Sequence, residues 1–356
     1  MAACTLPPVK ALSEGKAQGT RRPTMNDVAN LAGVSLATVS RVVNGSGEVR
    51  ADLAERVRDA VDVLGYRRDL MASNLRRSDR VSATIGLIIE DVANPFFSAV
   101  HRGVEDVARE HGVITFAGSS DEEPRREHEL ADAFGARGVD GLVIVPCGSD
   151  QGYLQRERRL GTQLVFVDRP ARFIDADAVV SDNAPGARRG VEHLLAHGHR
   201  RIALLGDRPA VFTAAERRRG YLDALAAAGI AADPALQHVG LAESVAAEAA
   251  TRELMGNGEP PTALFAAQNL IALGAIRALR ELGLQHEIAL VGFDDVTLAD
   301  MIEPGITVIK QDPYAIGRRA AELLFNRMQG HTGATEVVVL PTQLVVRGSG
   351  EIRPAG

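Results

Sequence analysis

The sequence predicts a small all-α N-terminal domain followed by a larger α/β core built on parallel sheets. Two short helix patterns joined by a tight turn occupy residues 24–45, and a third helix pattern covers Ala51–Leu64. From Val81 onward, apolar strand-like runs alternate with helix-like runs, which is typical of parallel strands covered on both faces. The 356 residues, 46% of them hydrophobic, are enough for two or three folded units.

The first helix is expected to begin near Met25. Thr24 can accept a hydrogen bond from an exposed helix amide, and Asp27 places an acid near the positive end of the helix. Val28 and Leu31 then fall on one helix face, which we expect to pack inward. Gly33 can adopt the left-handed conformation that ends a helix.

The second helix is predicted to begin after Ser35, whose side chain can cap it. Val39 and either Val42 or Val43 would face the first helix. Such a helix can enter the major groove of DNA, where its N-terminal side chains meet base edges while hydroxyl groups and arginine contact phosphates. The predicted DNA contacts are the outward residues Leu36, Ala37, Thr38, Ser40 and Arg41, together with Thr24, Ser35 and Asn44.

The third helix repeats Leu53, Val57, Ala60 and Leu64 at helical spacing, and Gly65 can end it. It can close a small core over the first two helices, although three helices this short bury little surface. A plain helical hairpin with a solvated polar face would give the same pattern in residues 24–45. The added third helix favours the DNA-binding interpretation.

The segment after the third helix, YRRDLMASNLRRSDR, contains a helix-capable run from about Asp69 to Arg76 with arginines at both ends. This pattern is typical of a linker that becomes ordered on contact with a polyanion. The net charge of −6 is unevenly divided, because residues 1–80 contain 13 Lys and Arg against 9 Asp and Glu, whereas the remainder contains 27 against 37. An acidic chain can therefore carry a basic end that faces DNA.

Residues 1–20 are small, polar and proline-containing, and we predict that they form a disordered extension. They lack the apolar core of a signal peptide, and no apolar run in the chain approaches the ~20 residues that span a bilayer. The two cysteines, Cys4 and Cys147, argue against a disulfide framework. We therefore expect a cytoplasmic protein that does not contact a membrane.

The core shows its clearest strand and helix patterns in an alternating order. The predicted strands cover residues 84–89, 113–117, 141–145, 164–167, 202–205, 263–265 and 288–291. The predicted helices cover residues 97–110, 187–196, 215–228, 270–282 and 314–328. Open sheets of this kind bind ligands outside the carboxyl ends of their strands.

Seven stretches make the chain resemble the LacI/GalR (lactose/purine repressor) family over about residues 24–348. They are DVANLAGVSLATVSRVVNG, SNLR, IGLIIEDVANPFF, HGHRRIALLGD, ALGAIRALRELGL, VGFDD and ITVIKQDPYAIG. The resemblance implies a helix-turn-helix headpiece (21–66), a hinge helix and linker (67–80) and an effector-binding core (81–350). That core would be similar to type I periplasmic sugar-binding proteins.

The resemblance also implies how the core is divided and how the protein acts. Two doubly wound lobes, one of residues 81–168 and 312–333 and the other of residues 170–310 and 334–350, would be joined by three crossovers. The implied protein is a homodimer that binds near-palindromic double-stranded operator DNA, most commonly as a repressor. A sugar or related metabolite between the lobes would control its affinity for the operator by shifting the lobes and releasing the hinge.

The resemblance gives Leu75 a specific role, because the matching leucine of each family member is a wedge in the DNA minor groove. An inserted side chain costs a few kcal/mol of unstacking, and contacts with the bent DNA offset this cost. Arg68 stands where family members usually carry a proline just before this helix. The change removes a preset backbone angle and adds a charge that can bind phosphate. Packing of Leu75 against the core is the alternative.

A sugar site needs carboxylates, amides and a guanidinium for hydroxyl groups, and an aromatic face for C–H bonds. Facing lobes would bring the loops after their strands into one cleft. The candidate effector residues at these positions are Asp91, Asn94, Pro95, Phe96, Asp168, Arg169, Thr213, Arg217, Phe265, Gln268, Asp294 and Gln311. The match to the family's ligand positions is closest at Asp168, Arg217, Phe265 and Asp294.

Each candidate has a structural alternative. The aspartates could cap the following segment, the phenylalanines could belong to the core, and Arg217 could pair with a neighbouring acid. Gln268 and Asn269 stand where the family usually has Asn-Asp. The change removes a carboxylate, so the identity of the effector cannot be transferred from a known member.

Other chemistry finds little support in the sequence. His193, His197 and His199 are close enough to suggest zinc, but no further ligand follows at a suitable spacing. GxGxxG, GxxxxGK[ST] and GxSxG are absent, so dinucleotide, nucleotide and hydrolase sites are not indicated. We expect no enzymatic activity, cofactor or metal. A plain sugar-binding transport component would leave residues 24–80 without a role, and an enzyme would need a catalytic set that the sequence does not show.

Overall fold

The computed structural model describes residues 23–66 and 82–355, which belong to two compact units divided at Arg80–Val81. The predicted N-terminal extension and the predicted hinge segment with Leu75 lie outside the described residues. None of the helices in the described part of the chain is long and apolar enough to cross a membrane.

The N-terminal unit consists of α1 (Met25–Ala32), α2 (Leu36–Asn44) and α3 (Ala51–Leu64). All three end at glycines in the left-handed conformation, including the predicted stops Gly33 and Gly65. Their core is made of Val28, Ala29, Ala32, Val39, Val57 and Ala60. The prediction for Leu31 is wrong, since its side chain is 52% exposed. The buried face of α1 contains Val28, Ala29 and Ala32, and Leu31 lies beside that face.

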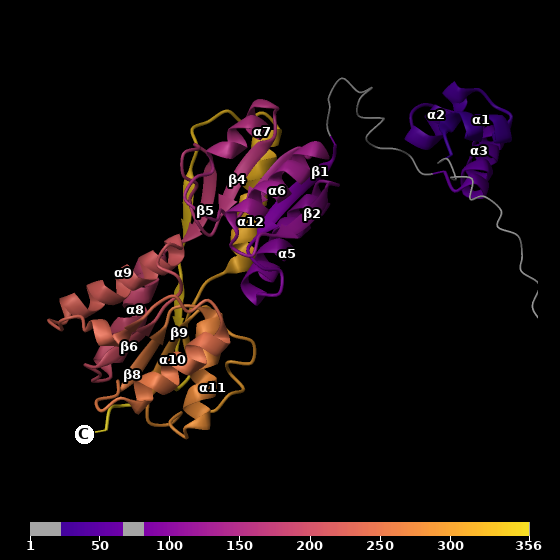
Figure 1. Ribbon diagram of the computed structural model, residues 1–356. Helices are drawn as coiled ribbons and strands as arrows, with labels where there is room; N and C mark the ends of the chain where they lie inside the picture. The colour runs from indigo at the N-terminus through magenta and orange to yellow at the C-terminus, as the bar shows by residue number, and fades with distance from the viewer. Residues whose placement is uncertain (1–22, 67–81, 356) are drawn as a thin grey trace, which may run out of the picture. The chain divides into compact units, whose positions relative to one another are not determined.

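The larger unit contains two lobes, each built on a six-stranded sheet (Figure 1). The first sheet has the order β11-β5-β4-β3-β1-β2, and the second has the matching order β12-β10-β9-β8-β6-β7. All pairings are parallel except that of β12 with β10. The first sheet comprises β1 (Thr84–Ile89), β2 (Ile114–Ser119), β3 (Gly141–Ile144), β4 (Gln163–Val167), β5 (Asp177–Ser181) and β11 (Val337–Leu340). The second comprises β6 (Ile202–Leu205), β7 (Gln237–His238), β8 (Ala263–Ala266), β9 (Ala289–Phe293), β10 (Thr307–Lys310) and β12 (Gln343–Val345).

Helices cover both faces of each sheet (Figure 1). The first lobe carries α5 (Pro95–Glu110) and α12 (Pro313–Met328) on one face, with α6 (Pro124–Ala136), the 3₁₀ turn η1 (Gly152–Leu154) and α7 (Gln155–Arg159) elsewhere in the lobe. The second lobe carries α8 (Asn183–Ala196) and α9 (Phe212–Ala227) on one face and α10 (Ser244–Gly256) and α11 (Asn269–Glu281) on the other, with the 3₁₀ turn η2 (Pro234–Leu236).

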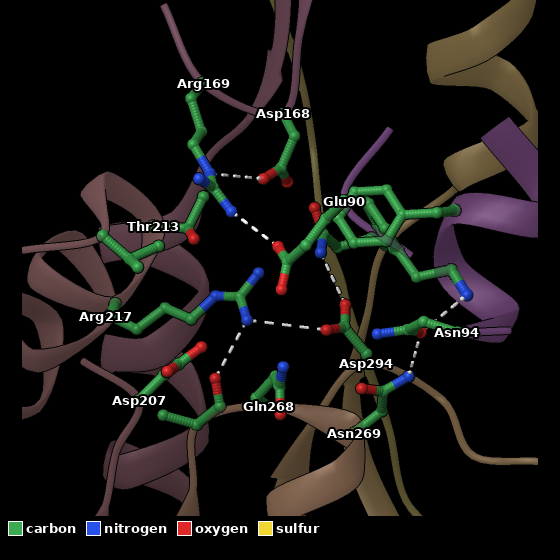
Figure 2. Close-up of a pocket in the computed structure, with 16 residues that line it drawn as sticks. Glu90, Asn94, Asp168, Arg169, Asp207, Thr213, Arg217, Gln268, Asn269 and Asp294 are labelled. Carbon is green, nitrogen blue, oxygen red and sulfur yellow. Dashed lines mark hydrogen bonds and ion pairs between the residues drawn. The ribbon is translucent and has the colours of Figure 1, made fainter. Parts of the chain in front are cut away.

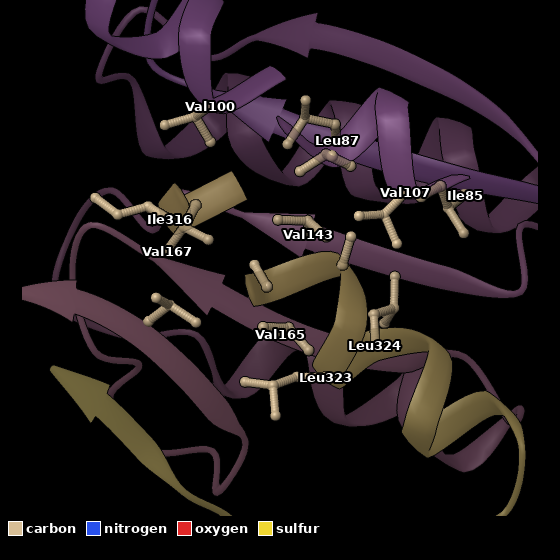
Figure 3. Close-up of a cluster of buried hydrophobic side chains, with 14 of the residues drawn as sticks. Ile85, Leu87, Val100, Val107, Val143, Val165, Val167, Ile316, Leu323 and Leu324 are labelled. Atoms are coloured by element: carbon tan, nitrogen blue, oxygen red, sulfur yellow. The ribbon is translucent and has the colours of Figure 1, made fainter. Parts of the chain in front are cut away.

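Burial on both faces explains the continuous apolar runs of the strands. Along β1, the side chains of Ile85, Leu87 and Ile89 enter the core beneath α5 and α12, whereas Ile88 enters the core on the side of α6. Figure 3 shows the first of these cores, where Ile85 and Leu87 meet Val107 of α5 and Leu324 of α12. This two-sided burial is typical of parallel sheets.

The chain passes between the lobes three times, at residues 181–183, 310–313 and 340–343. The predicted lobe boundaries are therefore wrong in two places, because β5 and β11 belong to the first sheet. The two strands pair with each other at the edge of that sheet, and β5 also pairs with β4. Neither β5 nor β11 is among the strands predicted from the sequence, and the predicted second lobe therefore wrongly includes both segments.

Glycines allow the backbones of three helix pairs to touch. A Cβ atom at Gly317 of α12 would meet the backbone carbonyl oxygen of Val100 in α5. Gly220 of α9 meets α8 in the same way, and Gly274 of α11 meets α10. Each helix pair covering these faces thus depends on a glycine at its crossing.

Replacing Gly317 with alanine should lower the free energy of unfolding of the larger unit by roughly 1–3 kcal/mol, because backbone atoms cannot move aside for the added methyl group. Thermal unfolding of the purified variants measures the change. Gly256→Ala is the matched control, since Gly256 also lies in a helix but has open space around its Cβ position. Equal melting temperatures for the two variants would contradict the proposed close contact.

Candidate functional site

The N-terminal unit presents the predicted DNA-reading helix with both of its ends capped. Thr24 and Asp27 form a reciprocal capping box at α1, and the Ser35 hydroxyl accepts a hydrogen bond from the Thr38 N–H at 3.2 Å. The α2 helix ends at Gly45 in the left-handed conformation. The turn between α1 and α2 is formed by Gly33, in the left-handed conformation, and by the Ser35 cap, and Arg56 of α3 donates to the Gly33 carbonyl oxygen at 3.5 Å.

The outward face of α2 contains the side chains that the sequence analysis assigned to DNA. Leu36, Ala37, Arg41 and Asn44 are exposed, and Thr38 and Ser40 are half-buried. The Leu36 side chain is 46% exposed although Val39, one turn further on, is fully buried. Asn44 donates to the Ser40 hydroxyl at 3.0 Å, and the Thr24 hydroxyl is bound to Asp27 at 2.6 Å. Thr24 therefore has a capping role in the structure.

A pocket lies between the two lobes of the larger unit. Polar side chains from the ends of strands in both sheets line it, with aromatic residues from the start of α5 (Figure 2). The lining residues are Glu90, Asn94, Phe96, Phe97, Asp168, Arg169, Asp207, Val211, Thr213, Ala214, Arg217, Ala267, Gln268, Asn269, Asp294 and Gln311.

Arg217 is the buried cation contributed by the second lobe. Its Nε donates to Asn183 Oδ1 at 2.7 Å, and its Nη1 donates to the Ala267 carbonyl oxygen at 2.9 Å and to Asp294 at 3.5 Å. The guanidinium carbon lies 3.9 Å from the centre of the Phe293 ring. These contacts offset the cost of burying the charge and fix the side chain in place.

Arg169 is the buried cation contributed by the first lobe. Its Nη1 lies 2.6 Å from Glu122, its Nη2 lies 2.8 Å from Glu90, and its Nε lies 3.3 Å from Asp168. One guanidinium therefore faces three carboxylates. Figure 2 shows the Glu90 carboxylate bonded to Arg169, with Arg217 drawn below Arg169.

Burial raises the pKa of several of these carboxyl groups. The pKa of Glu90 rises to about 7, chiefly through burial, and repulsion from Glu122, Asp168 and Asp207 adds to the rise while Arg169 opposes it. Burial also raises the pKa of Asp168 and of Asp294, against the effect of the arginines. Burial in the pocket thus favours the protonated, neutral form of these three acids.

The two buried aspartates occupy matching positions in the two lobes. Asp168 follows β4 with φ of 67°, and Asp294 follows β9 with φ of 69°. Asp and Asn enter this left-handed region more readily than other residues that carry a Cβ. The turn directs each carboxylate toward the cleft, where Gln311 donates to Asp294 at 2.5 Å.

A hydrogen bond crosses the cleft between Asn269 of the second lobe and Asn94 of the first. The Asn269 Nδ2 donates to Asn94 Oδ1 at 2.8 Å, and the same oxygen accepts from the Phe96 N–H at 3.1 Å as the cap of α5. An aspartate at position 269 could not donate this bond when ionised. The departure from the family's usual Asn-Asp pair therefore changes a contact between the lobes.

Nine of the candidate effector residues line the pocket: Asn94, Phe96, Asp168, Arg169, Thr213, Arg217, Gln268, Asp294 and Gln311. Asp91 and Phe265 do not, and neither does Pro95. Asp91 accepts a hydrogen bond from the Ala93 N–H in the turn before α5, at 2.8 Å. Phe265 is fully buried in the core beneath α8 and α9, as the structural alternative had it.

The sequence analysis missed several lining residues: Glu90, Phe97, Asp207, Val211, Ala214, Ala267 and Asn269. Glu90 and Asp207 could have been found, because each is an acid within two residues of the carboxyl end of a predicted strand. The histidines considered for zinc have other partners. His193 pairs with Glu351, and His199 contacts Thr262 and the Ile352 carbonyl oxygen.

The raised pKa of Glu90 predicts a specific dependence of stability on pH. A carboxyl whose pKa rises from 4.5 to about 7 on folding favours the folded state below pH 4.5, and this advantage disappears as the pH rises through about 7. The free energy of unfolding of the larger unit should therefore fall across this range by on the order of 3 kcal/mol more in the native protein than in Glu90→Gln.

Denaturant unfolding at pH 5, 6, 7 and 8 measures this difference. Glu129→Gln, on the exposed side of α6, is the control and should follow the native protein. Parallel pH profiles for the native protein and Glu90→Gln would show that Glu90 ionises at its ordinary pKa.

Comparison with known families assigns both parts of the chain. Residues 24–69 match the family model of bacterial regulatory proteins of the lacI family, and residues 191–350 match a periplasmic binding protein-like domain. The chain is 35% identical over 343 residues to the HTH-type transcriptional regulator CelR of Thermobifida fusca, covering 93% of this chain and 99% of that protein. It is 31% identical over 333 residues to the HTH-type transcriptional repressor CytR of Escherichia coli, covering 93% and 97%.

Solved structures show the same architecture. The Lac repressor dimer bound to operator and the anti-inducer ONPF matches with a TM-score of 0.79 and 29% identity, over 93% of this chain and 99% of that one. A CelR–cellobiose complex matches with a TM-score of 0.69 and 33% identity, over 92% and 100%. The capped helix-turn-helix, the two-lobed core and these similarities together place the chain in the LacI family of bacterial transcriptional regulators.

Proposed function

We propose that the protein is a homodimeric repressor whose affinity for a near-palindromic operator is controlled by a small hydroxylated metabolite bound between the lobes of its core. The observation that carries the proposal is the buried pocket lined by two arginines, carboxylates and amides, in a chain that also presents a capped helix-turn-helix. Relatives in complex with cellobiose, ONPG or ribose support a sugar or sugar-like ligand.

The α2 helix is proposed to lie in the major groove. Leu36 and Ala37, at its exposed N-terminal end, would meet base edges, while Thr38, Ser40 and Arg41 would serve phosphates or adjacent bases. Leu75, outside the described residues, would act as the minor-groove wedge at the centre of the operator.

The edge strand β2 is proposed to form part of the dimer interface. Among the described strands, β2 pairs only with β1. Its apolar residues Ile114 and Phe116 are 58% and 40% exposed. Apolar side chains on an open sheet edge are a liability in a monomer, and a second copy would cover them. Pairing of two cores would provide two recognition helices for the two half-sites of the operator.

The proposed protein acts on DNA in the cytoplasm and has no catalytic role. Its relatives are transcriptional regulators. The polar side chains of the pocket are fixed by hydrogen bonds, such as those of Arg169 with Glu122 and of Arg217 with Asn183, and fixed polar groups suit the recognition of a ligand. An exported sugar-binding protein would have no use for a capped DNA-reading helix.

Selection of binding sites from a random duplex library tests the DNA-reading assignment. The native protein should return one near-palindromic consensus, and the Leu36→Tyr, Ala37→Gln double variant should return a different one, since these residues are assigned to base edges. Ser40→Ala serves as the comparison and should weaken all sites alike without changing the consensus. The same consensus from the double variant and the native protein would refute the assignment.

Sedimentation of Phe116→Glu tests the dimer interface. A charge on each side of a self-complementary interface should convert the dimer into monomers at micromolar concentration, because two unpaired carboxylates would be brought together. Leu160→Glu, a change at another exposed apolar residue of the first lobe, should leave the dimer intact. Unchanged sedimentation of Phe116→Glu would exclude β2 from the interface.

A further inference from the structure

The pocket between the lobes contains more acidic than basic side chains. Four carboxyl groups line it, from Glu90, Asp168, Asp207 and Asp294, against the two guanidinium groups of Arg169 and Arg217. Glu122, which does not line this pocket, is also paired with Arg169. Asp207 forms an ion pair at 3.6 Å with Arg208, which does not line the pocket.

Most N–H groups of the two arginines already have protein acceptors, and the Nη2 of Arg217 is the one guanidinium nitrogen of the pair without an acceptor among the described residues. Arg169 is bound to Glu122, Glu90 and Asp168 and also donates to the Pro146 carbonyl oxygen at 3.1 Å. Arg217 is bound through Nε and Nη1 and is stacked on a phenylalanine ring. An anionic ligand would have to compete with these protein acceptors while facing four carboxyl groups.

Two further acceptors in the pocket lack a donor. The Oε1 atoms of Gln268 and Gln311 are buried and have no hydrogen-bond partner among the described residues. Gln311 is only 3% exposed, and its Nε2 is already bound to Asp294, which leaves its oxygen for a ligand. A buried acceptor without a donor is costly, so a ligand rich in N–H or O–H groups would be favoured.

We propose that the effector is a polyhydroxylated metabolite carrying a protonated amine, of the amino-sugar class, whose ammonium group lies between Glu90 of the first lobe and Asp207 of the second. The inference rests on the proposed effector function of the pocket and specifies its ligand class. The hydroxyl groups of such a ligand supply donors to Gln268 and Gln311, and Phe96 and Phe97 supply apolar surface for its C–H bonds.

An ammonium group at this position also explains how a small ligand favours one arrangement of the lobes. Glu90 and Asp207 repel each other across the cleft, and this repulsion contributes to the raised pKa of Glu90. A cation between them turns the repulsion into two attractions that exist only when the lobes are close together. A neutral sugar lacks this differential interaction.

Isothermal titration of the full-length protein with matched hexose derivatives tests the proposal. Three ligands are compared: the amino sugar, the neutral sugar and the uronic acid. Each is tested in the gluco, galacto and manno series. In at least one series the amino sugar should bind at least tenfold more tightly than the neutral sugar, and the uronic acid should not bind. Glu90→Gln and Asp207→Asn should each remove most of the preference for the amino sugar over the neutral sugar, and Glu129→Gln should leave this preference unchanged.

Equal or tighter binding of the neutral sugar or the uronic acid would overturn the proposal, as would a preference for the amine that survives both substitutions. Absence of binding by all three amino sugars would overturn it as well. Operator binding by the same protein is measured in parallel, because loss of DNA binding would instead contradict the proposed regulatory function.

Discussion

The burial of charged side chains where the strands of the two sheets end is the constraint on which the rest of the core depends. A guanidinium or carboxylate removed from water is tolerated only when partners surround it. Arg217 meets this requirement with an amide oxygen, a backbone carbonyl, an aspartate and an aromatic ring that come from α8, β8 and β9. Arg169 meets it with three carboxylates and a carbonyl. The sheets must hold these groups in place before any ligand binds.

The two lobes satisfy this constraint in the same way because they share one strand order. Asp168 and Asp294 stand at equivalent strand ends, and each has its N–H bonded to the neighbouring strand, at Val179 and Ile309. Each lobe also contains a helix pair that crosses at a glycine. The cleft is therefore formed by two similar edges that carry different side chains, such as Glu90 on one side and Asp207 on the other.

The sequence predicted the N-terminal unit and the central strands well because their signals are local. Caps such as Ser35 and stops such as Gly65 are readable from a few residues, and the strands of residues 84–89 and 202–205 coincide with β1 and β6. The lobe boundary failed because the membership of β5 depends on pairing with β4 and β11, which is not local. Phe265 was misassigned because the two faces of a buried strand carry similar apolar residues.

Coupling between the cleft and the DNA-reading unit is the central claim, and reciprocity makes it measurable without knowledge of the effector. If occupancy of the cleft changes operator affinity, operator binding must change the affinity of the cleft for the effector by the same factor, through a change in the state of the core. Hydrogen exchange of the intact protein, with its selected operator and with a scrambled duplex, shows whether operator binding changes the core. The operator alone should alter hydrogen exchange at the amides that follow β4, β8 and β9. Changes confined to the N-terminal unit would contradict it.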